Sequence, residues 1–120
     1  MIILSKPNKS IQSVGIILGG GSSTRTGQID KIFYKIQGIP IIFYSIMKFN
    51  KNSSIDHTIV VVPEKKNNLI KKMIDQWNFK NITVISGGKR RQDSVFNALQ
   101  EIRKNRIFKD IKLVAVHDAA

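Results

Sequence analysis

Four short apolar runs rich in β-branched residues alternate along the chain with longer segments in which apolar residues recur every three or four positions. Short runs of this kind are typical of strands buried on both faces, and the longer spacing is typical of an apolar stripe on a helix. The predicted strands cover residues 14–18, 58–62, 82–85 and 113–116. The predicted helical stripes consist of Ile39, Ile42, Phe43, Ile46 and Met47, of Leu69, Ile70, Met73, Ile74 and Trp77, and of Val95, Phe96, Leu99 and Ile102.

The order of these elements predicts the fold class. Strands that alternate with helices form a parallel sheet with right-handed crossovers, covered by helices on both faces. We therefore expect an α/β fold with a doubly wound, mainly parallel sheet in one domain over residues 14–120, after an N-terminal extension over residues 1–13. If the strand order is 3-2-1-4, the loops after the first and fourth strands open on one crevice. Within the extension, Ile2 to Leu4 could add an edge strand.

Composition narrows the class of protein. The chain has 120 residues, 42% of them hydrophobic, which is enough for one domain with its own core. It has no cysteine, so disulfides and thiolate zinc sites are excluded. No apolar run approaches the length that crosses a bilayer, and residues 1–4 are too short for the apolar part of a secretory signal. We expect a cytoplasmic protein, or a plastid one in a eukaryote, with no membrane partner.

The formal charge of +12 is consistent with a lysine-rich solvated surface or with an anionic ligand. Basic pairs such as Lys65-Lys66 and Arg103-Lys104 fall where helices would face water, which favours the first explanation. The basic residues are not interleaved with exposed aromatic residues, and no zinc-finger or aromatic RNA-binding signature is present. The sequence therefore argues against a nucleic-acid partner, although a basic nucleic-acid-binding module stays open as an alternative from charge alone.

A run rich in glycine and hydroxyl residues follows the first predicted strand, from Gly19 to Gly27. Such a loop can hold phosphates with its backbone amides, or it can serve as a flexible connector. Arg25 within the run and Lys31 just beyond it are cations that a bent loop could aim at one triphosphate. The Walker pattern fails because no Gly-Lys-Ser/Thr ends the run, and the dinucleotide fingerprint fails at Thr24.

Two further loops follow predicted strands. Gly87-Gly88 precedes a helix that opens near Ser94, and this segment is either a ligand-binding helix opening or an ordinary turn capped by Asp93 or Ser94. His117-Asp118 ends the fourth strand, where a carboxylate suits a magnesium ligand or a ribose contact. We expect His117 to be a packed, hydrogen-bonded residue rather than a catalyst.

Three separate segments resemble the family of 2-C-methyl-D-erythritol 4-phosphate cytidylyltransferases, in the family's own order. This resemblance implies a Rossmann-like sheet of the nucleotidyltransferase type and the transfer of CMP from CTP to a polyol phosphate in the non-mevalonate isoprenoid pathway. Ribitol-5-phosphate cytidylyltransferase is the nearest alternative, and a non-catalytic dinucleotide-binding domain is a weaker one. The segments are 16–27 with Asp30-Lys31 and 38–41, then 87–95 with 97–99, and finally 116–120.

Carried over residue by residue, the resemblance implies roles for most of these positions. Arg25 and Lys31 are implied as catalytic residues that stabilise charge on the triphosphate. Asp118 is implied beside the ribose and as the protein ligand of Mg²⁺. The implied CTP-binding residues are Gly19, Gly20, Gly21 and Ser22 in the loop, Gly88, Lys89 (through its main chain) and Ser94 at the cytosine, and Asp118 and Ala119 at the sugar. The chain departs from the family's usual residues at Ser23, Thr26, Asp30 and Ile32.

The sequence stops at Ala120, directly after a motif that the family continues with Arg-Pro. The resemblance therefore implies that the sheet is incomplete at its C-terminus. It also implies that the segments that bind the polyol phosphate and form a homodimer in the full-length protein lie beyond this residue. We expect the chain alone to catalyse nothing.

Overall fold

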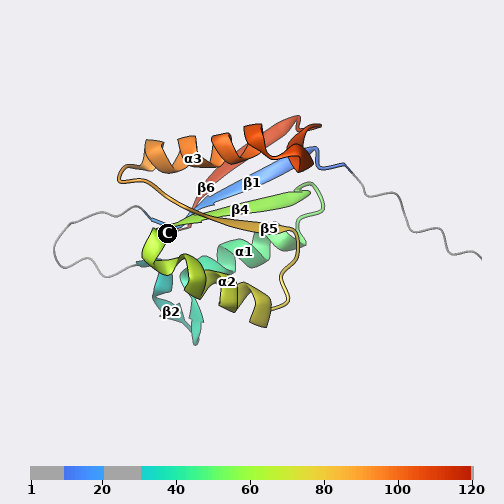
Figure 1. Ribbon diagram of the computed structural model, residues 1–120. Helices are drawn as coiled ribbons and strands as arrows, with labels where there is room; N and C mark the ends of the chain where they lie inside the picture. Colours follow the sequence, from blue (N-terminus) through green and yellow to red (C-terminus); the bar gives the residue numbers. More distant parts are fainter. Residues whose placement is uncertain (1–9, 21–30, 120) are drawn as a thin grey trace, which may run out of the picture.

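A four-stranded parallel sheet forms the centre of the computed structural model, which describes residues 10–20 and 31–119 (Figure 1). Every neighbouring pair of strands in this sheet runs parallel, and the order is β5-β4-β1-β6. This is the 3-2-1-4 order in the numbering of the predicted strands, and the predicted fold class is confirmed. The strands are β1 (Ser13–Leu18), β4 (His57–Val62), β5 (Ile82–Ser86) and β6 (Leu113–Asp118).

Helices cover both faces of the sheet, as a doubly wound fold requires. α1 (Ile41–Lys51) and α2 (Asn67–Gln76) pack on one face, and α3 (Arg91–Lys104) packs on the other (Figure 1). Side chains alternate along each strand, so β1 and β4 contribute residues to a separate core on each face. Ile17 and Val60 face α1 and α2, whereas Ile16 and Val61 face α3.

The two middle strands are buried along their whole length, but the two edge strands are not. The prediction of burial on both faces is confirmed for β1 and β4 and is wrong for the others. β5 is half-buried, and β6 leaves Leu113 and Val116 exposed. The physical reason is position: within the described part of the chain, β5 and β6 each pair with a single neighbour, so each has one side without a partner strand.

The predicted apolar stripe of α3 is only partly the face that packs. Ser94, Ala98 and Ile102 are buried at a spacing of four residues, while Phe96 is 58% exposed and Leu99 is exposed as well. The packed face of α3 differs from the predicted one because the small residues Ser94 and Ala98 allow the helix to approach the sheet closely. The apolar flank with Phe96 and Leu99 is left beside it.

Most of the other predicted helical residues pack as expected. Ile42, Phe43 and Ile46 of α1 are buried, and α1 begins directly after Pro40. Trp77, at the end of α2, packs edge-on against Phe43 with 5.1 Å between ring centroids, although part of the indole remains exposed.

Several short elements were not predicted from the periodicity. The chain re-enters the described region at η1 (Lys31–Phe33) and then forms a small antiparallel hairpin of β2 (Lys35–Ile36) and β3 (Ile39–Pro40). Gln37 and Gly38 both have positive φ, of 53° and 79°, which is the geometry of a tight two-residue hairpin turn. The remaining short helices are η2 (Glu64–Lys66) and η3 (Arg106–Phe108).

The first strand begins one residue before the predicted domain boundary at residue 14. β1 begins at Ser13, and the carbonyl oxygen of Gln12 accepts hydrogen bonds from the backbone N–H groups of Lys112 and Leu113, at 2.7 and 3.1 Å. The possible strand at Ile2 to Leu4 lies outside the described residues. Among the described helices, none has the length and apolar character needed to cross a membrane.

Candidate functional site

The carboxyl ends of β1 and β6 lie side by side, so the loops that follow them are neighbours. Leu18 pairs with Asp118 in the sheet register, and the backbone N–H of Ala119 donates to the carbonyl oxygen of Leu18 at 3.0 Å. Gly19 and Ala119 therefore leave the sheet next to each other. The strand order reverses between these two strands, which is where open parallel sheets bind ligands.

The first two glycines of the loop after β1 have distinct physical roles. Gly19 donates its backbone N–H to the carbonyl oxygen of Val61 at 2.6 Å, and a Cβ at this position would lie only 2.9 Å from a methyl carbon of Val62. Gly20 has φ of +86°, a conformation that favours glycine, and open space surrounds it. Close packing thus requires the first glycine, and backbone geometry requires the second. Gly21, Ser22 and Arg25 lie outside the described residues.

The loop after β5 is tied back onto the start of α3. Gly87 donates its N–H to the carbonyl oxygen of Val62 at 2.8 Å, and Gly88 donates its N–H to Oγ of Ser94 at 3.1 Å. Ser94 is only 3% exposed, so its hydroxyl is a fixed acceptor for this loop. The Gly87-Gly88 turn therefore leads directly into the start of α3, a feature that both alternatives from the sequence share.

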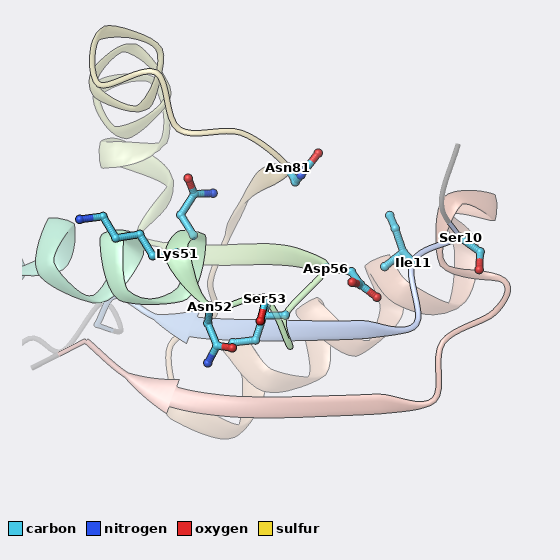
Figure 2. A pocket seen from close by; sticks show the side chains of 9 residues that line it. Ser10, Ile11, Lys51, Asn52, Ser53, Asp56 and Asn81 are labelled. Atoms are coloured by element: carbon cyan, nitrogen blue, oxygen red, sulfur yellow. The ribbon is translucent and has the colours of Figure 1, made fainter. Parts of the chain in front are cut away.

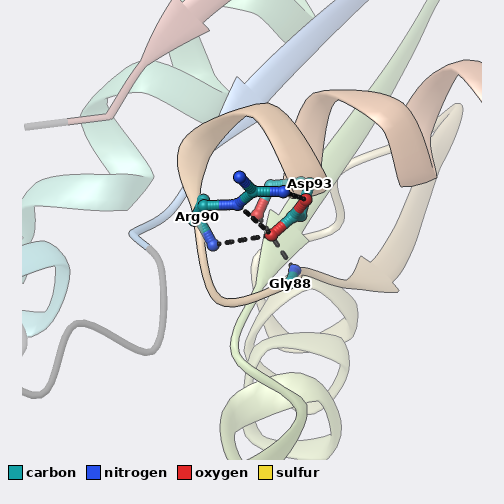
Figure 3. Close-up of polar contacts among 4 residues, drawn as sticks. Gly88, Arg90 and Asp93 are labelled. Atoms are coloured by element: carbon teal, nitrogen blue, oxygen red, sulfur yellow. Dashed lines mark hydrogen bonds and ion pairs between the residues drawn. The ribbon is translucent and has the colours of Figure 1, made fainter.

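An ion pair within the first turn of α3 fixes the same loop from the solvent side (Figure 3). Two guanidinium nitrogens of Arg90 donate to the carboxylate of Asp93 at 3.0 and 3.1 Å, and the backbone N–H of Arg90 donates to it at 3.1 Å. The hydrogen bond from Arg90 holds the pKa of Asp93 below its ordinary value, and the same contact raises the pKa of Arg90. Asp93 is therefore ionised at neutral pH and caps the helix.

Two asparagines brace the end of β5 from opposite faces of the sheet. Asn67, at the start of α2, donates its side-chain N–H to Oγ of Ser86 at 3.2 Å, and Asn97 of α3 donates to the carbonyl oxygen of Ser86 at 3.2 Å. Oδ1 of Asn67 is buried and has no hydrogen-bond partner among the described residues. These contacts position the Gly87-Gly88 loop. No local sequence pattern indicates them, because Asn67 and Ser86 are 19 residues apart.

A second ion pair joins the start of α3 to the end of β6. Nε of Arg91 donates to Oδ1 of Asp118 at 3.1 Å, and Nη2 donates to Oδ2 at 3.3 Å. Both side chains are largely exposed, at 61% and 54%. This contact links the loop after β5 to the loop after β6. Arg91 lies within the segment 87–95 but is not among the site residues predicted from the sequence.

Lysines line the same edge of the sheet. Lys31 is exposed on η1, whose neighbouring residue Ile32 is buried in the core that faces α1. The burial of Ile32 gives a packing role to this departure from the usual residues of the family that the sequence resembles. Lys66, on η2 after β4, places its Nζ 5.2 Å from the ring centroid of Phe33. Lys89 is exposed in the loop after β5.

His117 is held by packing contacts on the face opposite Asp118. Its Nε2 lies 3.5 Å from Oγ of Ser45, and its ring centroid lies 5.5 Å from that of Phe49. Both partners belong to α1, so the imidazole points toward that helix and away from the ion pair of Arg91 with Asp118. His117 is exposed, however, so the expectation of a packed residue is met by these contacts with α1 but not by burial.

Asp118 is the metal ligand predicted from the sequence at this edge. The described residues contain no cluster of three or more acidic, histidine or cysteine side chains that could hold a metal ion. Mg²⁺ in nucleotide sites typically has one or two carboxylate ligands, with substrate phosphates and water completing its coordination. A single carboxylate such as that of Asp118 fits a magnesium ion that arrives with phosphates.

A surface pocket of about 520 Å³ lies at the opposite edge of the sheet, where β1, β4 and β5 begin (Figure 2). Its lining is mostly polar and includes Asn52, Asp56 and Asn81. The carboxylate of Asp56 accepts hydrogen bonds from the backbone N–H groups of Gln12 and Ser13, at 2.9 and 3.2 Å. The pocket includes none of the residues predicted to bind CTP.

The fold and the arrangement of the loops define a Rossmann-like α/β domain of the nucleotidyltransferase type. The model of the 2-C-methyl-D-erythritol 4-phosphate cytidylyltransferase family matches residues 14–120, and the chain belongs to this family.

Curated relatives agree with this placement. A 2-C-methyl-D-erythritol 4-phosphate cytidylyltransferase of Clostridium perfringens is 39% identical over 109 residues, covering 89% of this chain and 46% of the relative. One from Clostridium botulinum is 36% identical over 112 residues, covering 92% and 47%. The chain thus spans about half the length of the curated relatives it matches.

Two solved structures share the fold. A crystal structure of 4-diphosphocytidyl-2C-methyl-D-erythritol synthase superposes with a TM-score of 0.71 at 21% identity, covering 92% of this chain and 47% of that one. The inositol-1-phosphate CTP transferase from T. maritima superposes with a TM-score of 0.56 at 19% identity, covering 81% and 40%.

Proposed function

We propose that this chain binds CTP with Mg²⁺ and forms the nucleotide-binding part of a cytidylyltransferase. In this proposal the whole enzyme transfers CMP from CTP to 2-C-methyl-D-erythritol 4-phosphate and releases pyrophosphate. The product is 4-diphosphocytidyl-2-C-methyl-D-erythritol. One observation carries the proposal: in a chain of this family, the Gly19-Gly20 turn and Asp118 lie beside each other where the strand order reverses. A homodimer of the whole enzyme is part of the same proposal.

The proposed reaction requires little covalent chemistry from the protein itself. The acceptor's phosphate monoester is largely dianionic at neutral pH, because its second pKa is near ~6, so it attacks the α-phosphorus without a protein base. A bond forms between an acceptor phosphate oxygen and the α-phosphorus, and the bond from that phosphorus to the departing pyrophosphate breaks. The task of the protein is to align these groups and to neutralise the charge that develops.

Cationic and backbone groups would perform this task. Arg25 and Lys31 would stabilise negative charge on the α-phosphate and on the pyrophosphate. The backbone amides of Gly19, Gly20, Gly21 and Ser22 would hold the triphosphate. Asp118 would hold Mg²⁺ together with phosphate oxygens, and the ion would supply further positive charge at the reacting phosphates.

The loop after β5 would read the base. Gly88 and the main chain of Lys89 would contact the cytosine, and Ser94 would contact it through its hydroxyl or through the loop that this hydroxyl fixes. Asp118 and Ala119 would contact the sugar. The support for this assignment is that Gly88 and Ser94 are already joined by a hydrogen bond, so the loop is ordered before a ligand arrives.

The test is a titration of the ¹⁵N-labelled chain with CTP and Mg²⁺, followed through backbone amide shifts. We expect shifts at Gly19, Gly20, Gly88 and Ala119, and weaker binding of UTP, whose base presents a different pattern of donors and acceptors. Lys31→Ala should weaken CTP binding by roughly 10-fold, because a hydrogen bond to a charged group contributes about 1.5–3 kcal/mol. Arg25→Ala should have an effect of the same order.

Lys35→Ala is the matched control for Lys31→Ala. Lys35 is an exposed lysine four residues farther along, on the hairpin strand β2. It should leave CTP affinity unchanged. Equal losses in the two variants would indicate general attraction by a basic surface and would count against specific roles for Arg25 and Lys31. Binding of CTP and UTP with equal affinity would refute the assignment of Gly88 and Ser94 to the base.

Acceptor identity needs a separate assay in a protein of the relatives' full length. Formation of product from 2-C-methyl-D-erythritol 4-phosphate, and not from ribitol 5-phosphate, is the expected result. The 120-residue chain alone should bind CTP without forming product. Product formation by the chain alone would show that the acceptor site lies within these residues.

A further inference from the structure

The ion pair between Arg91 and Asp118 occupies the carboxylate that the proposed function assigns to Mg²⁺. Each oxygen of Asp118 accepts one guanidinium N–H, at 3.1 and 3.3 Å, so the contact is bidentate. A planar guanidinium matches the geometry of a carboxylate in this way, and it orients the carboxylate as well as attracting it. Asp118 is therefore held in one orientation at the mouth between β1 and β6.

The same pair is easily exchanged. Both side chains are more than half exposed, at 61% and 54%, and ion pairs in such surroundings are weak because water competes for both partners. A phosphate group offers a guanidinium the same bidentate geometry as a carboxylate does. A triphosphate that binds beside Gly19 and Gly20 can thus replace Asp118 as the partner of Arg91.

We propose that Arg91 is a positioning residue that makes metal binding by Asp118 depend on the nucleotide. In the free protein, Arg91 holds both carboxylate oxygens and competes with divalent cations. When a nucleoside triphosphate arrives with its metal, Arg91 exchanges the carboxylate for phosphate oxygens, and Asp118 becomes a ligand of the metal. This inference rests on the proposed function.

The neighbouring arginine provides a matched control. Arg90 is as exposed as Arg91 and is also paired with an aspartate, but its partner Asp93 lies within the same turn of α3. Removing either guanidinium deletes one positive charge from the start of the same helix. Only the Arg91 variant also frees the carboxylate at the end of β6.

The experiment compares the wild-type chain with Arg91→Gln and Arg90→Gln, using Mn²⁺ as a paramagnetic substitute for Mg²⁺. Mn²⁺ alone broadens the amide signals of residues near its binding site. In Arg91→Gln the signals of His117, Asp118 and Ala119 should broaden at roughly threefold lower Mn²⁺, because the weak competing ion pair is absent. The affinity for CTP with Mg²⁺ should fall by roughly threefold or more, since the guanidinium no longer reaches phosphate.

Opposite signs in the two measurements distinguish this role from a structural one. A residue that only supported the loop would, when replaced, weaken both kinds of binding or neither. Arg91→Lys retains the charge but not the bidentate fork, so it should give an intermediate Mn²⁺ affinity. Asp118→Asn should abolish the broadening at these three amides in both the wild-type and the Arg91→Gln backgrounds, which ties the signal to this carboxylate.

Different experimental outcomes would refute the inference about Arg91 and the proposed function. If wild-type chain binds CTP with Mg²⁺ but Arg91→Gln has the Mn²⁺ response of wild type, the inference is overturned and the proposed function stands. The inference is also overturned, and the proposed function stands, if Arg90→Gln changes both the Mn²⁺ response and the affinity for CTP as Arg91→Gln does. If wild-type chain binds no CTP at any Mg²⁺ concentration, both are overturned. Amide spectra of each variant show whether it is folded.

Discussion

Replacing Ser94 by alanine tests how the loop after β5 is held. The Ser94 hydroxyl accepts a hydrogen bond from the backbone N–H of Gly88 at 3.1 Å, and the side chain is 3% exposed. Alanine fits the same space, so Ser94→Ala removes the acceptor without opening a cavity of any size. The N–H of Gly88 then loses its partner.

The loss of stability in Ser94→Ala depends on how well water can replace the Ser94 hydroxyl as the hydrogen-bond acceptor of Gly88. A fully buried donor without a partner costs about 1–3 kcal/mol, whereas a neutral hydrogen bond that water can replace contributes about 0.5–1.5 kcal/mol. Gly88 is half-buried, so we expect a loss of about 1 kcal/mol in the free energy of unfolding. With a urea slope of about 2 kcal/mol per molar, the unfolding midpoint should fall by roughly 0.5 M.

Urea denaturation followed by tryptophan fluorescence measures this change. Trp77 is the chain's only tryptophan, and it packs against Phe43 and Phe79, so its emission reports on the core. Ser45→Ala is the control, since Ser45 is also buried, at 8% exposed, but its hydroxyl lies a long 3.5 Å from His117. The control should change stability by less than about 0.5 kcal/mol. Equal midpoints for Ser94→Ala and Ser45→Ala would refute the reasoning.

Two further predictions concern stability. Burial lowers the pKa of His57 below its ordinary value of 6.5, so as the pH falls the unfolded chain binds a proton before the folded chain does. The stability that the neutral His57 contributes is therefore complete above about pH 6.5 and is lost as the pH falls below that value. His57→Gln can keep the 2.8 Å hydrogen bond to Thr83. In this variant the urea midpoint should decrease less between about pH 7 and 5 than it does in the wild type, and an equal decrease in both proteins would contradict this. Gly20→Ala should cost about 1 kcal/mol of backbone strain at φ +86°. Gly19→Ala should cost more, because its Cβ would lie too close to Val62, and a higher urea midpoint for Gly19→Ala than for Gly20→Ala would contradict the packing argument.

Much of the architecture could be predicted because its signals are local. The β-branched runs and helical stripes gave the central strands, the three main helices and their order. That order, with the right-handed crossover rule, predicts a doubly wound parallel sheet. The loops after the strands then meet at one edge of that sheet. For this reason Gly19, Ser94 and Asp118 could be named as site candidates from the sequence, together with Arg25 and the other residues outside the described ranges.

Burial at the periphery could not be read from the same signals. An apolar run predicts a strand, but it does not say whether the strand lies in the middle of the sheet or at its edge. The exposure of β6 is therefore a property of the sheet's order. Likewise the helical period of α3 is compatible with several packed faces, and the small side chains of Ser94 and Ala98 decided which one meets the sheet.

The sequence by itself thus determined the four central strands, the three main helices, the fold class and the positions of the loops, because the signals for these depend on residues within a few positions of one another. Only the tertiary structure decided which polar groups meet. Arg91 and Asp118 are 27 residues apart, and Asn67 and Asn97 reach Ser86 from opposite faces of the sheet. Such contacts carry no periodic signature, since they arise only when the strands are aligned and the helices are seated on them.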